Sequence, residues 1–422
     1  VLATLAFWVW AAPPARAGTI TVTTTEDLID AKGDCSLREA ILAANRDKSI
    51  DGCPAGGGAD TITLPAGTYK LALGGAGEDG NLTGDLDITG DLTINGAGRS
   101  VTTIDAAGLD RVIHIPNGKV TLAKLTLTQG FVEGDGGGVL LEAGQLTLID
   151  SRVTGNETGS SFYYDGGGIR AAAPLTVIAS RVDHNIASRG GGGGLYVGDT
   201  LTISYSWVDS NTADKYGGLL HGESAVIHNS LISDNVADGF SATPGANLIG
   251  GMGSFGPLTL VNSTISGNSA TEGTGGLLIA DTAGLFNVTI TANVANTNGA
   301  VTGAGAGGLA ISGFDTVHLS HSLVAGNLNN QPSVYAEDCK GTFESLDYNL
   351  IGDSIGCTLT GQTTHDLLDV DPLLDGLGNN GGPTKTHALN LGSPAIDRGD
   401  PQGCRDEKGD QAERQIGETH LV

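Results

Sequence analysis

A short phrase recurs seven times in the middle of the chain and constrains the fold more than any other feature. In each copy a Val or Ile is followed three positions later by an asparagine: Asn156, Asn185, Asn211, Asn235, Asn268, Asn293 and Asn327. Successive asparagines are 29, 26, 24, 33, 25 and 34 residues apart. A period in this range is typical of a solenoid, in which each repeat packs only on its neighbours.

A glycine pair and an alternating apolar segment precede most copies of this phrase. The pairs are 137–138, 167–168, 193–194, 217–218, 275–276 and 307–308, and the alternating segments include 146–148, 175–177, 201–203 and 258–260. Alternation with a period of two predicts short strands with apolar side chains on one side, so each repeat offers three short strands joined by turns. No helix-length amphipathic segment separates them, which excludes a βαβ arrangement. The sequence therefore predicts an all-β, single-stranded parallel β-helix.

Coiling places equivalent residues of successive repeats above one another. Coils about 4.8 Å apart predict that the first residues of the phrases form one interior row: Val153, Val182, Val208, Ile232, Ile265, Ile290 and Val324. The asparagines should form a second row at a turn, because Asn tolerates left-handed backbone geometry and stacked amides can hydrogen-bond between coils. We interpret this asparagine row as structural rather than ligand-binding. The glycines allow sharp corners and close packing inside a narrow tube.

The composition fits a thin core and narrows the choice of partners. The chain has 68 glycines, 39% hydrophobic residues and only 5% aromatic residues. Its 47 acidic residues against 21 Lys and Arg give a net charge of −26, which would repel nucleic acid and an anionic membrane surface. We therefore expect cations, glycans or surface proteins as partners of a monomer, with no required cofactor.

The N-terminal segment predicts export. Residues 1–12 form an apolar run, followed by Pro13, Pro14 and the small-residue triplet 15–17. This order is typical of a secretory signal peptide, here residues 1–17, and the run is shorter than the roughly 20 residues that cross a bilayer as a helix. The alternative is an N-terminal strand or buried helix. No later segment is a membrane-span candidate.

The cysteines agree with a secreted or cell-surface protein. They lie in two clusters on either side of a long cysteine-free middle, which suits local disulfides in the terminal caps of an exported protein. We predict the pairs Cys35–Cys53 and Cys339–Cys357, with Cys404 unpaired. Their spacing does not suggest a zinc site.

A solenoid needs caps over its end strands. Residues 36–46 are the best helix candidate, since Ser36 and Glu39 form a capping box and an apolar stripe can cover the first coil. We divide the chain into the signal peptide, an N-terminal cap at 18–70, the repeats at 71–335 and a C-terminal cap or anchor-associated region at 336–422.

Three motifs resemble known families. Cys35-Ser-Leu-Arg-Glu-Ala40 closely resembles the signature of CSLREA-domain secreted bacterial proteins. Residues 379–384 (NNGGPT) and 392–397 (GSPAID) resemble the choice-of-anchor C-terminal region, and the repeats resemble polymorphic outer-membrane passenger domains. The resemblance implies a right-handed parallel β-helix outside a bacterial cell, and it implies no established catalytic residues. The tail departs from the family pattern, because residues 414–417 lack its cysteine. This departure suggests either a truncation or a reading-frame error near the C-terminus.

The repeat alignment places two aspartates together. Because Val182 points inward, Asp183 points outward, and Asp209 does so one coil later, about 5 Å away. Carboxylates so placed repel, raising one pKa or recruiting a cation, and this spacing is that of retaining glycosidases. Asp183 and Asp209 are therefore the catalytic candidates. The alternatives are cation or glycan contact, or two solvated surface aspartates.

The surroundings of this pair favour ligand binding. Arg181 and Trp207 flank the aspartates, with Tyr205 and His184 close by, and exposed rings can stack on sugars. Aromatic residues are concentrated within residues 162–216, although these rings could instead fill a loop insertion. The predicted ligand-binding residues are Arg181, Trp207, Tyr205, Tyr196, Tyr216 and His184.

A second acidic cluster is a candidate calcium site. Asp79, Asn81, Asp85 and Asp87 offer several hard oxygen ligands within a few residues, as Ca²⁺ requires. They lack EF-hand spacing. Turn formation by Asp, Asn and Gly is the alternative explanation.

Enzyme signatures are sparse. The chain has no Asp-Asp pair and no Gly-His-Gly, and its only Arg-x-Lys is at 46–48, so a pectinase-like hydrolase mechanism is disfavoured. We predict a secreted or cell-surface β-helix interaction protein, adhesin-like or glycan-binding. The alternative is a polysaccharide lyase or glycoside hydrolase acting along the outer groove, and a third possibility is a purely structural stalk.

Overall fold

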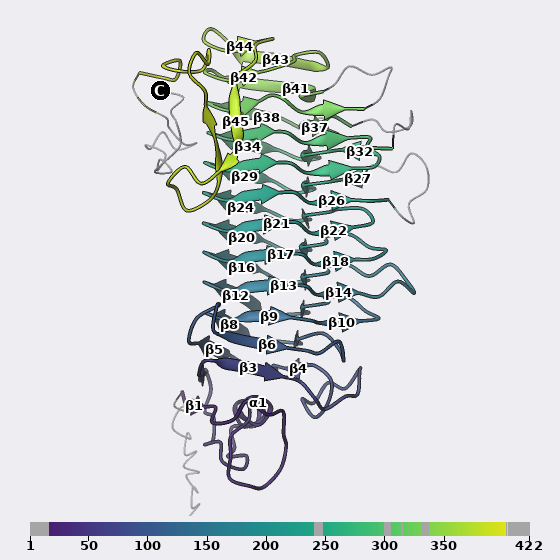
Figure 1. Cartoon of the computed structure of the whole chain (residues 1–422), viewed down its shortest axis with the longest axis vertical. Coiled ribbons are helices and arrows are strands. Elements are labelled where there is room, and N and C mark those ends of the chain that lie inside the picture. The colour runs from purple at the N-terminus through teal and green to yellow at the C-terminus, as the bar shows by residue number, and fades with distance from the viewer. Residues whose placement is uncertain are drawn as a thin grey trace, which may run out of the picture.

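The computed structural model describes residues 17–239, 248–298, 305–313, 315–330, 337–401 and 403. Most of the predicted signal peptide, Cys404 and the 414–417 segment lie outside these residues. Within them the chain winds as a right-handed parallel β-helix (Figure 1), which confirms the fold class predicted from the repeats. No helix among the described residues is long and apolar enough to cross a membrane.

Each coil passes through three sheet faces, which we call faces 1 to 3. From β11 onward, the face 1 strands begin directly after a glycine pair. Face 1 contains β4 (Leu86–Asp87), β7 (Ile113–Ile115), β11 (Val139–Leu141), β15 (Ile169–Ala171), β19 (Leu195–Val197), β23 (Leu219–His221), β28 (Met252–Ser254), β33 (Leu277–Ile279) and β37 (Leu309–Ile311). Face 2 contains β1 (Thr19–Thr21), β2 (Asp60–Leu64), β5 (Leu92–Gly96), β8 (Lys119–Ala123), β12 (Gln145–Ile149), β16 (Leu175–Ile178), β20 (Leu201–Ser204), β24 (Ala225–His228), β29 (Leu258–Val261), β34 (Ala283–Phe286), β38 (Val317–Ser320) and β43 (Cys357–Gln362). The long strand β41 (Cys339–Leu346) pairs with both faces.

Face 3 carries the repeated phrase. It contains β3 (Gly67–Lys70), β6 (Thr102–Asp105), β9 (Thr126–Thr128), β13 (Arg152–Thr154), β17 (Arg181–Asp183), β21 (Trp207–Asp209), β25 (Leu231–Ser233), β30 (Thr264–Ser266), β35 (Thr289–Thr291), β39 (Leu323–Val324), β42 (Leu350–Ile351) and β44 (Leu367–Leu368).

The structure adds a fourth short strand to the three predicted for each coil. These two-residue strands follow the asparagine corner: β10 (Phe131–Val132), β14 (Glu157–Thr158), β18 (Ile186–Ala187), β22 (Thr212–Ala213), β26 (Val236–Ala237), β31 (Ser269–Ala270), β36 (Val294–Ala295) and β40 (Leu328–Asn329). Beside them β27 (Leu248–Ile249) pairs with β32 (Gly273–Thr274). Two residues are too few to show alternation, so the sequence pattern missed them.

The predicted interior row is confirmed. The seven Val and Ile residues that begin the phrases pair in parallel register from coil to coil and are at most 1% exposed. The glycine pairs explain the narrowness of the tube, since a Cβ on Gly168 would lie 2.5 Å from the carbonyl oxygen of Gly194 on the next coil. Any side chain there would push the coils apart.

The asparagine row forms a continuous hydrogen-bonded ladder. Each Nδ2 from Asn156 to Asn293 donates to the Oδ1 of the next asparagine at 2.8–3.0 Å, and Asn327 donates to Asp338 at 2.8 Å. The left-handed residue of this corner precedes the asparagine, for example His184 with φ 54° and Ser210 with φ 56°. The structural role is confirmed, but left-handed tolerance of Asn is not its cause here.

A second ladder was not predicted. At the corner between faces 2 and 3, the backbone N–H of Ser151 donates to Ser180 Oγ, that of Ser180 to Ser206 Oγ, and that of Ser206 to Ser230 Oγ, at 3.0–3.2 Å. The sequence pattern could have predicted this ladder, because a serine stands two residues before the inward Val or Ile in these repeats.

The caps use the predicted helix and disulfides. Helix α1 (Leu37–Arg46) has the capping box of Ser36 and Glu39 and contacts β2 and β4 at the N-terminal end (Figure 1). The pairs Cys35–Cys53 and Cys339–Cys357 are both disulfide-bonded, with Cα atoms 4.8 and 5.5 Å apart. Strands β1 and β2 already belong to face 2, so the tube begins within the 18–70 segment.

The C-terminal segment turns back toward earlier coils. Strands β45 (Leu374–Gly378) and β46 (Thr386–Leu389) form an antiparallel hairpin, which we call the C-terminal hairpin. The Trp207 indole N–H donates to the Pro383 carbonyl oxygen in its loop at 3.4 Å, and Ser266 Oγ lies 2.8 Å from His387 Nε2 on β46. The hairpin therefore rests against face 3.

Candidate functional site

A pocket of about 540 Å³ lies on the outer side of face 3. We call it the arginine pocket. Strands β13, β17 and β21 form its floor, and the C-terminal hairpin forms one wall. Its lining includes Arg99, Asp150, Arg152, Arg181, Tyr205, Trp207 and Pro383.

Strand register places the pocket's main side chains. Arg152, Arg181 and Trp207 occupy equivalent positions on β13, β17 and β21. Each stands one residue before the inward Val of its strand, so all three project outward. Of these, Arg181 and Trp207 were predicted. Arg152 was missed, although it occupies the same Ser-Arg-Val context as Arg181.

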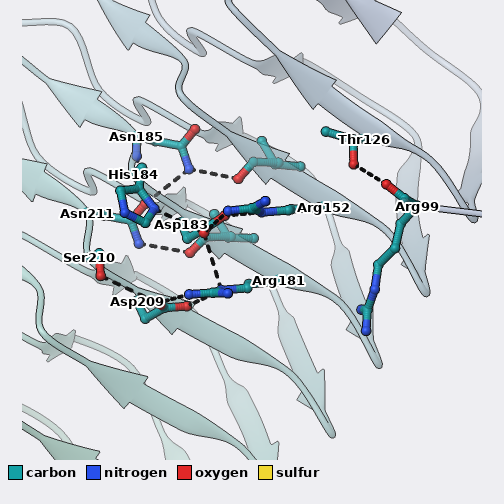
Figure 2. Close-up of polar contacts among 12 residues, drawn as sticks. Arg99, Thr126, Arg152, Arg181, Asp183, His184, Asn185, Asp209, Ser210 and Asn211 are labelled. Atoms are coloured by element: carbon teal, nitrogen blue, oxygen red, sulfur yellow. Dashed lines mark hydrogen bonds and ion pairs between the residues drawn. The ribbon is translucent and has the colours of Figure 1, made fainter. Parts of the chain in front are cut away.

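The two catalytic candidates lie in register as predicted, and arginines bind both of them (Figure 2). Arg152 Nε donates to Asp183 Oδ1 at 2.8 Å, and Arg181 Nε donates to Asp209 Oδ1 at 2.8 Å. Arg181 Nε also lies 3.2 Å from Asp183 Oδ2. A guanidinium thus stands between the carboxylates, where a retaining glycosidase would need to hold the sugar.

The structure contradicts the solvated-surface alternative for these aspartates and the expectation of a raised pKa at Asp183. Asp183 is 0% and Asp209 5% exposed, so they are not solvated surface residues. Burial by itself would raise the pKa of Asp183, but the hydrogen bond from Arg152 and the charges of both arginines outweigh it and hold that pKa below its ordinary value. The arginines supply positive charge beside both carboxylates, and cation or glycan contact remains a prediction.

The Arg152–Asp183 and Arg181–Asp209 pairs, which we call the arginine–aspartate ladder, present positive charge outward. The side chains of Arg152 and Arg181 are 38% and 34% exposed, whereas those of Asp183 and Asp209 are 0% and 6% exposed. Hydrogen bonds to these aspartates raise the pKa of both guanidinium groups, so they remain charged. A ligand in the pocket meets N–H donors, while the compensating carboxylates are covered.

Arg99 adds a third guanidinium from a distant part of the chain. It follows β5, and its Nη1 donates to the Ala179 carbonyl oxygen at 2.9 Å (Figure 2 shows its side chain). Its Nε lies 3.5 Å from Asp150 Oδ1, and both side chains are 47% exposed. No repeat pattern predicts this residue, since it lies in a turn that only coiling brings to the pocket.

Trp207 forms a wall between two cations. The Arg181 guanidinium carbon is 5.1 Å and Lys385 Nζ 5.8 Å from the indole ring centroid. Both distances are within the range of cation–π attraction. Lys385 belongs to the loop of the C-terminal hairpin and was not predicted.

The other predicted ligand-binding residues divide between the pocket and elsewhere. Tyr205 lines the pocket. His184 is a turn residue whose Nδ1 lies 3.0 Å from Asp183 Oδ2, and it is not part of the lining. Tyr196 lies on face 1, where the Arg170 guanidinium carbon is 4.6 Å from its ring centroid. Tyr216 packs edge-on to Phe255 at 5.9 Å.

The four residues predicted as calcium ligands do not form one site. Asn81 Nδ2 donates to the Arg38 carbonyl oxygen at 2.9 Å, and its side-chain oxygen accepts from the Asp87 backbone. Asp85 pairs with Arg111 at 2.9 Å, and burial, opposed by Arg111, raises the pKa of Asp85 to about 7. The contacts of Asn81 and Asp85 therefore stabilise the fold. Asp79 and Asp87 instead come together with His114.

Comparisons with known proteins add little beyond the fold. No family model and no curated protein matches the chain, so the CSLREA and choice-of-anchor resemblances remain predictions. The structure of pectate lyase Pel9A is similar over 96% of this chain and 90% of its own, with 14% identity and a TM-score of 0.43. A mannuronic acid specific polysaccharide family 6 lyase from human gut microbiota is similar over 73% and 86%, with 12% identity and a TM-score of 0.26. Likenesses this distant carry no argument about activity.

Proposed function

We propose that the protein works outside the cell and binds acidic polysaccharides in the arginine pocket. The observation that carries this proposal is the asymmetry of the arginine–aspartate ladder, in which the guanidinium groups face the pocket and their carboxylates are buried. The two disulfides agree with an oxidising compartment.

The pocket chemistry matches a chain of charged sugars. Guanidinium groups on neighbouring coils offer planar, fork-like donors suited to carboxylates and sulfates. The Trp207 ring offers an apolar face for the carbon skeleton of a sugar. Since the chain carries a net charge of −26, a polyanion is attracted only locally, so binding should be confined to this pocket and should weaken with salt.

The carbohydrate-active alternative is a polysaccharide lyase rather than a glycoside hydrolase. Hydrolysis by Asp183 and Asp209 is disfavoured, because arginines occupy both carboxylates. Eliminative cleavage of a uronate instead needs cationic groups that stabilise charge developing on the carboxyl group, and the pocket supplies them. Tyr205 is the pocket side chain best suited to exchange a proton with a substrate, as a general base or acid.

Binding and cleavage can be measured with one protein. In a chain starting at residue 18, Trp207 is the only tryptophan, so its fluorescence reports events in the pocket. We expect polygalacturonate and alginate, but not neutral glucans, to change this fluorescence in a saturable, salt-sensitive manner. Ultraviolet absorbance of unsaturated products detects any lyase activity.

Arginine variants decide the proposal. Arg152→Gln and Arg181→Gln should each weaken acidic-glycan binding at least about tenfold. Arg189→Gln should not, because Arg189 is a half-buried loop residue outside the pocket lining. Equal binding of neutral and acidic glycans, or unchanged affinity in both pocket variants, would refute it. If the unchanged protein forms unsaturated products and Tyr205→Phe does not, the lyase alternative would be established.

A further inference from the structure

A histidine and three carboxylates gather on face 1, away from the arginine pocket. Asp87 on β4 and His114 on β7 are register partners on adjacent strands. Asp79 comes from the loop before β4, and Glu142 follows β11. Asp87 is fully buried and His114 is 5% exposed, whereas the side chains of Asp79 and Glu142 are 75% and 57% exposed.

The ligand atoms of this cluster have the spacing of a metal site. His114 Nδ1 lies 3.0 Å from Asp87 Oδ1 and 3.7 Å from Asp79 Oδ1, and the three atoms are all within 4.8 Å of one another. Ligands about 2.1 Å from a tetrahedral ion are separated by about 3.4 Å. The two distances from His114 Nδ1 each differ from this separation by about 0.4 Å or less. The Asp79 and Asp87 oxygens are at most 4.8 Å apart, so the exposed Asp79 side chain would make the larger adjustment to contact the same ion.

The other ring nitrogen of His114 provides an independent observation. His114 Nε2 is buried and has no hydrogen-bond partner within the described structure, and it lies 3.6 Å from Glu142 Oε2. Histidines that bind metals usually donate their second N–H to a carboxylate, which orients the ring. The second oxygen of Asp87 is held in a similar way, since it accepts the Asn81 backbone N–H at 2.8 Å.

We propose that Asp79, Asp87 and His114 bind a divalent transition-metal ion of the Zn²⁺ class, with Glu142 supporting His114. An imidazole nitrogen with two carboxylates suits such an ion better than Ca²⁺, which takes oxygen ligands. The nearby guanidinium of Arg111 pairs with Asp85 at 2.9 Å. The exposed Asp79 leaves the ion a route from solvent and a position for water.

The proposed site differs from the predicted calcium site in both its metal and its ligands. The acidic cluster suggested Ca²⁺ bound by neighbouring residues, and the absence of clustered Cys and His ligands argued against zinc. The actual ligand set combines a loop and two strands, with His114 lying 27 residues beyond Asp87. Such a site would fix the loop that carries Asp79 to the first coils, and it does not depend on glycan binding.

Metal titration tests the proposal directly. The untagged full-length chain, stripped with a chelator, is titrated with Zn²⁺ and separately with Ca²⁺ by calorimetry, and Co²⁺ is used as a spectroscopic probe. We expect one Zn²⁺ per chain, weaker binding of Ca²⁺, a Co²⁺ spectrum typical of nitrogen and oxygen ligands, and a higher unfolding temperature with Zn²⁺.

Matched variants assign the ligands. Asp79→Asn and His114→Gln should weaken Zn²⁺ binding at least about tenfold and remove the thermal shift, and Glu142→Gln should weaken it about 10- to 100-fold. The control is His318→Gln, a surface histidine 3.7 Å from one glutamate. Since Asp79 is exposed, Asp79→Asn decides the question even if His114→Gln fails to fold. Absence of Zn²⁺ binding, equal affinity for Ca²⁺, or undiminished binding by Asp79→Asn would overturn the proposal and leave the cluster a network of ion pairs.

Discussion

Arg181 on one coil binds Asp209 on the next through two hydrogen bonds, with Nε donating to Oδ1 at 2.8 Å and Nη2 donating to Oδ2. Arg152 binds Asp183 in the same way one coil earlier. These pairs reinforce the coil-to-coil stacking and also form the floor of the arginine pocket. The same side chains therefore contribute to stability and to the proposed ligand site.

The Arg181–Asp209 pair should be energetically coupled. Arg181→Gln leaves the nearly buried Asp209 carboxylate without its main partner and should lower the free energy of unfolding by about 1–3 kcal/mol. Arg181→Gln/Asp209→Asn should lose less than the sum of the two single variants, because it removes the uncompensated charge. Urea unfolding of the four proteins measures this coupling. Strict additivity would show that the pair does not stabilise the coils.

The asparagine ladder should be sensitive to a single break. Asn211→Ala removes the amide that accepts from Asn185 and donates to Asn235, and it leaves buried polar groups unpaired on both sides. We expect a loss of about 2–4 kcal/mol, since each unsatisfied buried group costs about 1–3 kcal/mol. Circular dichroism during urea unfolding checks this value against Asn117→Ala, which alters an exposed asparagine between β7 and β8. Equal midpoints for the two variants would contradict the ladder's importance.

His221 should make the stability of the tube pH-dependent. It is 0% exposed and pairs in register with the core residue Val197 on the preceding coil. Burial lowers its pKa to about 4, although its Nδ1 is hydrogen-bonded to the Glu223 carbonyl oxygen at 2.7 Å. The unfolded chain takes up this proton near pH 6.5 and the folded chain only near pH 4. Stability is therefore complete above about pH 6.5 and falls as the pH falls toward about 4, by about 3 kcal/mol in total.

A valine replacement isolates this contribution. His221→Val copies the residue of the preceding coil and should reduce the difference in unfolding free energy between about pH 7 and about pH 4.5 by about 2–3 kcal/mol. His318→Val, at a half-exposed position, should leave the difference unchanged. A wild-type slope that survives in His221→Val would mean that other groups cause it.

The C-terminal hairpin should be held less firmly when His387 is protonated or removed. His387 Nδ1 lies 2.7 Å from the Asp375 carbonyl oxygen, so this nitrogen donates and Nε2 accepts from the Ser266 hydroxyl. Burial lowers the pKa of His387, so the ring is neutral at neutral pH. As the pH falls through that pKa, the docked hairpin must bury a charged ring, which weakens docking. His387→Ala should increase hydrogen exchange of the hairpin amides about tenfold and shift Trp207 fluorescence. Unchanged exchange would show that other contacts hold the hairpin.

The fold was largely predictable because its signal is repeated. The interior Val and Ile row and the asparagine row each leave a mark in every repeat, and stacking converts those marks into columns. The capping helix and the two disulfides were predictable from local patterns. The serine row was equally visible but was not recognised, and the two-residue strands were too short to show alternation.

The site was predictable only where it follows the repeat. Arg181, Trp207 and the stacked aspartates followed from register, and Arg152 could have been added by the same rule. Arg99, Lys385 and Pro383 could not, because they lie in turns whose positions depend on how the chain coils and folds back.

The amino-acid sequence by itself determined the coil and its columns, since alternation and period act between neighbouring repeats. Only the tertiary structure decided the chemistry. Whether Asp183 is a free acid or a bound counter-ion depends on an arginine from another coil, and whether Asp79 and Asp87 form a site depends on His114. Such properties arise from distances and burial across coils, which a repeat pattern does not specify.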